Sequence, residues 1–190
     1  MTTHIENLVK LPQSKTFIGS EFLTWLWYQS ESTSMPMSVK KSGGKEYEVH
    51  VWIDDKVILE SPLSQVHTNA LKGGTPSQSP EAQIALQTGK SVKQAKIGMD
   101  ISGHGEFIFT LDSQDLSPRG VKLPEIQGED DEKSATIDIR IAQLEALSHA
   151  IDATFAQFIN QRTKRDWEEQ GLETIKKWID TKVIPTQELQ

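Results

Sequence analysis

The stretch that decides the fold reads SPEAQIALQTGK (79–90), SVKQAKIGMDI (91–101), SGHG (102–105), EFIFTLDSQDL (106–116) and SPRGVKLP (117–124). Ser79 can cap a helix, and Pro80 suits the first helical position because its missing N–H would have no partner there. Gly89 stands where the end of a helix favours a residue that tolerates positive φ. These signals predict a short helix between Ser79 and Gly89.

Two alternating segments follow this helix. Apolar residues at positions 95, 97, 99 and 101 alternate with polar residues or glycine, which is the period of a half-buried strand. The SGHG segment predicts a tight turn, after which Phe107, Phe109 and Leu111 restart the alternation. The stretch therefore predicts a capped helix that leads into a two-stranded antiparallel unit.

The residues before this stretch predict one more helix and several strands. Residues 21–30 (EFLTWLWYQS) have almost no polar face, so they predict a helix buried nearly all round, with Ser20 as its N-cap. Residues 31–45 are rich in Ser, Met, Gly and Lys and predict a flexible loop. Residues 47–53 alternate as a strand, 54–56 predict a turn, and 57–59 predict the return strand of a hairpin. Residues 66–71 predict a further strand.

The residues after the stretch predict helices. Residues 125–133 are acidic and lack apolar spacing, which indicates a solvated linker. Apolar residues at three- and four-residue spacing predict a long amphipathic helix over 141–158 and a shorter one over 167–179. The expected fold is α+β: an antiparallel meander with short packed helices in residues 17–124, then a C-terminal helical pair in residues 134–185. We expect one core to hold Trp25, Leu26, Ile97, Met99, Phe107 and Phe109.

Composition narrows the functional classes. The chain has 190 residues, no cysteine and a formal net charge of −7. Residues 1–124 hold 12 Lys/Arg and 13 Asp/Glu, whereas residues 125–190 hold 8 and 14. Binding to nucleic acid would therefore need a local positive patch. No apolar run approaches the roughly 20 residues of a membrane span, and the N-terminus lacks the pattern of a signal peptide. We expect a cytoplasmic protein without a membrane partner.

No motif predicts a catalytic centre. Gly89-Lys90-Ser91 copies the end of a phosphate-binding loop, but Ile84 stands where that motif needs glycine, and a helix ends there instead of beginning. The five histidines form no pair at helical metal-ligand spacing, and the carboxylates at 54–55, 112 and 115 fit turns. We expect no enzyme activity, no cofactor and no metal; a hydrolase without a sequence signature ranks last among the alternatives.

The densest positive region of residues 1–124 is the candidate site. It consists of Lys90, Lys93, Lys96, Arg119 and Lys122. Such lysines are usually a solvated face, but they can contact phosphates when they share one surface. Three tryptophans, at positions 25, 27 and 52, could serve as a base-stacking platform, although aromatic residues on a buried helix more often belong to the core.

Four features follow one another in residues 71–124: Ser79-x-Glu81-Ala82, Gly89-Lys90-x-Val92, Glu106-Phe107-x-Phe109, and Asp112…Leu116…Lys122-Leu123-Pro124. In this order they resemble the bacterial recombination-associated protein RdgC family, with a weaker echo at residues 17–27 and the segment after it. The chain looks like a short form that lacks most of the N-terminal half of longer members. The resemblance implies sequence-tolerant binding of duplex DNA, a dimeric ring-like assembly and restraint of recombinase activity, without catalysis.

Two functions follow as hypotheses. The leading one is an RdgC-like protein that occupies duplex DNA through Lys90, Lys93, Lys96, Arg119 and Lys122, which contact phosphates without reading sequence. The competing one is a protein-interaction module, such as an accessory or phage-derived factor, whose acidic C-terminal helices bind a protein partner or a second copy of the chain.

Overall fold

The computed structural model describes residues 18–32, 37–40, 46–61, 64–126 and 133–181. Among these residues six strands form one antiparallel sheet: β1 (Met37–Lys40), β2 (Glu46–Ser61), β3 (Ser64–Lys72), β4 (Ser91–Ile101), β5 (Gly105–Asp112) and β6 (Arg119–Lys122). The strand order is β1-β2-β4-β5-β6, and β3 pairs with the second half of β2 on the edge that β1 occupies in the first half. The fold class is α+β, as the sequence predicts.

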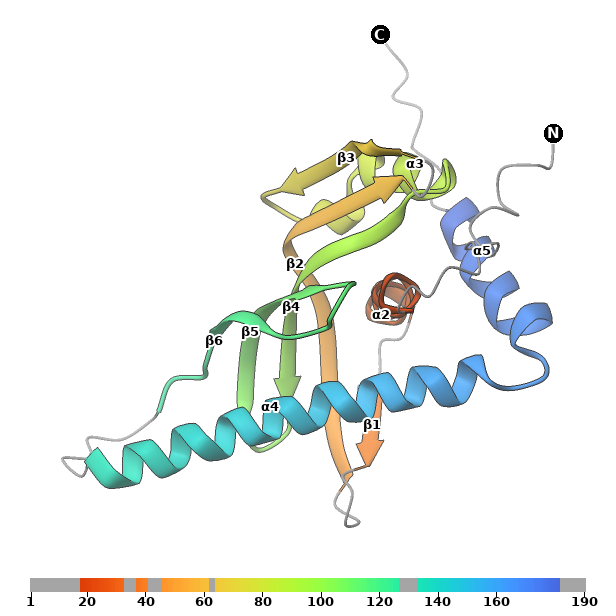
Figure 1. The fold of residues 1–190 in the computed structure, drawn as a ribbon. Coiled ribbons are helices and arrows are strands. Elements are labelled where there is room, and N and C mark those ends of the chain that lie inside the picture. The colour runs from red at the N-terminus through yellow and green to blue at the C-terminus, as the bar shows by residue number, and fades with distance from the viewer. Residues whose placement is uncertain (1–17, 33–36, 41–45, 62–63, 127–132, 182–190) are drawn as a thin grey trace, which may run out of the picture.

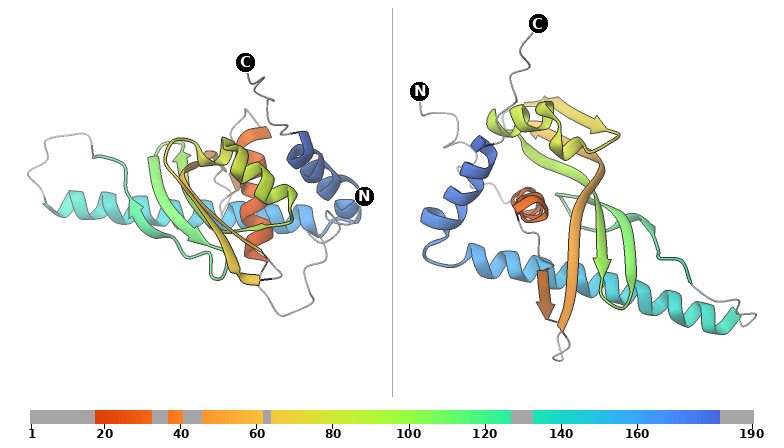
Figure 2. Two further views of the ribbon diagram at one scale, coloured as in Figure 1. Left: turned by 90° about the horizontal axis from the view of Figure 1, so that it is seen from above. Right: turned by 180° about the vertical axis from the view of Figure 1, so that it is seen from behind.

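The helices are α2 (Gly19–Ser32), α3 (Pro80–Gln87), α4 (Lys133–Arg162) and α5 (Leu172–Thr181). A 3-10 turn, η1 (Pro76–Gln78), precedes α3, and a π-helical turn, η2 (Trp167–Gly171), precedes α5. Figure 1 shows the sheet curving around α2, which is seen end-on. In this view α4 runs along the lower side, and α5 lies on the right, on the side of α2 away from the sheet. Figure 2 shows the same arrangement from above and from behind.

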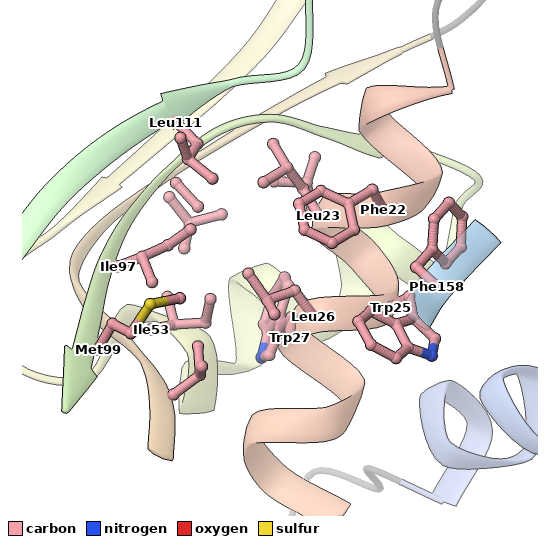
Figure 3. Close-up of a cluster of buried hydrophobic side chains, with 14 of the residues drawn as sticks. Phe22, Leu23, Trp25, Leu26, Trp27, Ile53, Ile97, Met99, Leu111 and Phe158 are labelled. Atoms are coloured by element: carbon pink, nitrogen blue, oxygen red, sulfur yellow. The ribbon is translucent and has the colours of Figure 1, made fainter. Parts of the chain in front are cut away.

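Helix α2 is apolar nearly all round because other elements surround it. Its side chains Leu23 and Leu26 lie toward the strands, whereas Trp25 lies toward Phe158 of α4 (Figure 3). The rings of Trp25 and Phe158 are 5.5 Å apart, and Trp25 Nε1 donates a 3.0 Å hydrogen bond to Gln161 Oε1. The helix therefore joins the sheet to the C-terminal helices in one core.

The predicted core is confirmed. Its six predicted members are all at most 2% exposed and lie in one apolar cluster: Trp25, Leu26, Ile97, Met99, Phe107 and Phe109. The cluster also includes Leu147, Ile151 and Phe158 of α4 and Ile175 and Ile179 of α5. The residues predicted as an α+β domain and as a C-terminal helical region thus share buried contacts, while residues 127–132 of the predicted linker lie outside the described part of the chain.

Both ends of helix α3 agree with the sequence signals. The Ser79 Oγ accepts a 3.2 Å hydrogen bond from the Ala82 N–H, and Pro80 begins the helix. Gly89 has φ +84°, and the Lys90 N–H donates to the Ala85 carbonyl at 3.0 Å. This is the geometry of a helix C-terminus, so the Gly89-Lys90-Ser91 segment is not the loop that opens a helix in phosphate-binding proteins.

Two predicted segments are wrong. Residues 54–56 do not turn: β2 continues from Glu46 to Ser61 and carries a bulge between Ile53 and Val57, where its register with β4 shifts. A bulge bends a strand and increases its twist, and β2 bends in this way around α2 (Figure 1). Part of the predicted loop 31–45 is the four-residue edge strand β1, which pairs Met37 with Val49 and Lys40 with Glu46.

Candidate nucleic-acid interface

Three of the five candidate residues, Lys96, Arg119 and Lys122, belong to the outer face of the sheet, opposite the core. Residues directly across an antiparallel ladder share a face. Trp52 of β2, Gly98 of β4, Ile108 of β5 and Lys122 of β6 therefore form one row across four strands. The neighbouring row holds Lys96, Thr110 and Arg119, and the row on the other side of Trp52 holds His50, Asp100 and Glu106.

Trp52 lies across Gly98 at the centre of this outer face. A Cβ atom built on Gly98 would be 2.0 Å from Trp52 Cε2, so the indole needs a glycine beneath it. The His50 ring is 5.7 Å away and tilted by 34°. Trp52 is half-buried, whereas Trp25 and Trp27 are buried in the core. Of the three tryptophans considered for base stacking, Trp52 alone lies on the outer face.

Lys96 of β4 binds two carboxylates of the β2 bulge. Its Nζ lies 2.9 Å from Asp54 Oδ2 and 3.0 Å from both carboxylate oxygens of Asp55. These hydrogen bonds raise the pKa of Lys96, with the Asp54 contact as the largest cause and Asp55 next. The ammonium therefore stays charged at neutral pH, and two acidic side chains offset its charge.

Two more candidate cations are also paired. Lys93 Nζ lies 2.9 Å from Glu60 Oε2, and the Arg119 guanidinium donates to the Asp115 carboxylate. The Ser117 backbone N–H first, and then Arg119, lower the pKa of Asp115. This carboxylate remains ionised beside Arg119 throughout the neutral range.

The remaining two candidates, Lys90 and Lys122, have no acidic partner among the residues that the structure describes. Lys90 Nζ donates a 2.6 Å hydrogen bond to Asn69 Oδ1 of β3, and this amide carries no charge. Lys122 is exposed and makes no ion pair with a described residue. The structure thus brings Lys96, Arg119 and Lys122 together in two adjacent rows near Trp52.

The outer face is not uniformly positive. Its acidic members include Asp54, Asp55, Asp100 and Glu106 on β2, β4 and β5. The cations lie toward one side of Trp52, in the row of Lys96 and Arg119, and the acidic row of Asp100 and Glu106 lies on the other side. An anionic ligand would therefore contact the rows that hold Lys96, Arg119 and Lys122 and avoid the row that holds Asp100 and Glu106.

Among the described residues, no group of three histidine or acidic side chains is placed to hold a metal ion. No helix in the described part of the chain combines the length and the apolar character of a membrane span.

Neither a protein-family model nor a curated protein sequence matches this chain. The resemblance to the RdgC family therefore stays a prediction that depends on the residues quoted above.

Proposed function

We propose that this chain is a non-enzymatic protein that binds duplex DNA without sequence preference, in the cytoplasm, and that it uses the outer face of the sheet. The observation that carries the proposal is the placement of Lys96, Arg119 and Lys122 in two adjacent rows on neighbouring strands. Three cations on one rigid face can contact successive phosphates of a backbone. The resemblance of residues 71–124 to the RdgC family supports the same function.

The ion pairs on this face make the proposed binding weak. A phosphate must displace Asp54 and Asp55 from Lys96, and Asp115 from Arg119. Surface ion pairs typically stabilise a protein by only about 0.2–1 kcal/mol each, so the exchange is feasible. The acidic chain as a whole repels DNA at long range. We therefore expect measurable binding at low ionic strength only.

Salt dependence tests the proposal. If Lys96, Arg119 and Lys122 neutralise about three phosphates, the logarithm of affinity should fall with the logarithm of salt concentration with a slope of about −2.7. Fluorescence anisotropy with a labelled duplex of mixed sequence measures this slope. Replacing Lys96, Arg119 and Lys122 together by glutamate should remove most binding on every sequence, whereas Lys177→Glu on α5, an exposed residue away from the sheet face, should have little effect.

Removing the carboxylates that pair with the cations should strengthen DNA binding. Asp115→Asn frees Arg119, and Asp54→Asn with Asp55→Asn frees Lys96, without removing a cation. Each change should strengthen DNA binding by about 1.5- to 5-fold, because the competing ion pair is lost. No binding by the original chain at low salt, or binding that does not respond to salt, would contradict the proposal.

A second candidate function is contact with a protein partner through α4. Among the described residues of this helix, the three most exposed large aliphatic side chains are Ile137 at 58%, Ile141 at 50% and Leu144 at 47%. Their spacing of four and three residues places them on one stripe, which is typical of a helix that packs into an apolar groove or against a second helix. This stripe is the observation that favours the protein-interaction alternative.

The stripe can be tested without affecting the core. The double substitution Ile141→Ser and Leu144→Ser should keep the melting temperature of the original chain, because both side chains already contact water. If the stripe pairs with a second copy, the same change should convert a dimer into a monomer in sedimentation experiments. A chain that is monomeric before and after the change would exclude self-association through α4.

A further inference from the structure

A cavity of about 270 Å³ lies where four elements meet. The first turn of α2, the C-terminal end of α4, the π-helical turn η2 and α5 form its walls. Figure 1 shows α2, α5 and the end of α4 converging at this end of the molecule. The cavity is separate from the outer face of the sheet that carries Lys96, Arg119 and Lys122.

Trp167 forms one wall and is held in place by its neighbours. A Cβ atom on Gly171 would lie 2.3 Å from Trp167 Cε3, so the indole packs over the glycine. Its ring also contacts Phe158 edge-on, with 6.1 Å between centroids and an angle of 82°. Ile175 and Ile179 are buried, and together with Leu172 they complete an apolar lining. These contacts give the cavity a fixed apolar surface.

The remaining lining is polar and carries net positive charge. Four cationic side chains and two carboxylates line the cavity: Arg162, Lys164, Arg165 and Lys176, with Glu21 and Glu168. Glu21 binds Arg162, and Lys176 Nζ lies 2.8 Å from Glu173. Lys164 and Arg165 are exposed and form no ion pair with any described residue. The two cations free to bind a ligand thus lie beside the apolar lining.

From this combination we infer that the cavity binds a small amphipathic anion, with its apolar body against Trp167 and Ile175 and its carboxylate or sulfonate at Lys164 and Arg165. The volume lies just below the usual range for sites that hold drug-sized ligands, which is about 300–1,000 Å³. A cavity of this volume suits a ligand whose apolar part is about two fused aromatic rings. Neutral and cationic ligands of the same shape lack the charged contact and should bind more weakly.

Calorimetric titration of the full chain with 2-naphthoate tests this inference. The matched neutral probe is 2-naphthalenemethanol, which keeps the two rings and lacks the charge. We expect 2-naphthoate to bind at one site with a dissociation constant on the order of 0.1–1 mM. The alcohol should bind about tenfold more weakly, because a charge-assisted hydrogen bond is lost.

Two variants distinguish the contact with the anionic group from the contact with the apolar rings. Replacing Lys164 and Arg165 by glutamine should weaken 2-naphthoate about tenfold and leave the alcohol unchanged. Leu172→Trp should fill the cavity and weaken both probes. The control is Lys177→Gln, an exposed neutral substitution on α5 whose residue does not line the cavity; it should change neither probe.

Several results would overturn the inference. They are equal affinity for the two probes, an unchanged affinity for 2-naphthoate in the glutamine variant, and no binding of 2-naphthoate at millimolar concentration. Binding of 2-naphthoate that appears only after removal of residues 182–190 would also overturn the inference, because that result would mean that the C-terminal segment competes with the ligand for the cavity. Melting temperatures of all variants should equal that of the original chain, which shows that each is folded.

Discussion

Replacing Phe109 by alanine is expected to lower the free energy of unfolding by about 3–5 kcal/mol, because the ring is lost from a filled core and leaves a cavity. Phe109 is 1% exposed and faces Ile97 across the β4–β5 ladder. In the same cluster, Phe22 and Trp25 of α2 pack against Phe158 of α4, and these contacts oppose a shift of α2 into the space that the ring leaves. Equilibrium unfolding in urea, with the far-ultraviolet circular dichroism as signal, measures the change.

The neighbouring residue provides the matched control. Ile108 lies on the outer face of β5, opposite Gly98 and Lys122, and is half-buried. Ile108→Ala should therefore cost less than about 1 kcal/mol. A loss below 1 kcal/mol for Phe109→Ala would place that side chain on the surface. Since a shift of one residue moves every side chain of a strand to the other face, such a result would overturn the register of β5.

The parts of the fold that the sequence predicted are those with strong local signals. The alternation from Ala95 to Leu111 specifies which side of each strand is buried, and the cap at Ser79 specifies where α3 begins. The nearly all-apolar residues 22–27 indicate an enclosed helix without naming what encloses it. Their contacts with Phe158 join segments more than 130 residues apart, which no local pattern can specify.

The errors have physical causes too. The polar residues Asp54, Asp55 and Lys56 interrupt an apolar alternation, and a turn and a bulge both suit such residues. The distinction depends on whether strand β4 continues alongside, and that is a tertiary contact. Strand β1 has only four residues and lies at an edge, so its sequence need not be apolar.

The candidate site was predicted in part. The sequence identified the cations, and the ladder places Lys96, Arg119 and Lys122 in adjacent rows. It did not identify the partners that offset their charge, because Asp54 and Asp55 come from β2, about 40 residues before Lys96. The cavity beside Trp167 had no sequence signal, since Lys164 and Arg165 lie in a turn and are followed by the acidic residues Asp166, Glu168 and Glu169.

Deleting residues 134–190 is expected to abolish cooperative folding of the rest. The deletion removes Ala150 and five large buried side chains from the shared core, and the large ones are Leu147, Ile151, Phe158, Ile175 and Ile179. At about 1.5–3 kcal/mol each, their loss amounts to roughly 8–15 kcal/mol. That is comparable to the whole stability of a typical domain, about 5–15 kcal/mol. The truncated chain should aggregate or show no thermal transition by circular dichroism and calorimetry.

The contrast with surface changes on the same helix distinguishes a shared core from two independent domains. Phe158→Ala alone should cost about 3–5 kcal/mol, because Phe158 is fully buried against Phe22 and Trp25. The exposed pair Ile141→Ser and Leu144→Ser should leave the melting temperature unchanged.

If the truncated chain stayed soluble and melted at the original temperature, residues 17–124 would be a separate domain, and the buried contacts of α2 with α4 would not contribute to its stability. The position of α2 between the sheet and α4 predicts the opposite, since removing α4 leaves Phe22 and Trp25 in water.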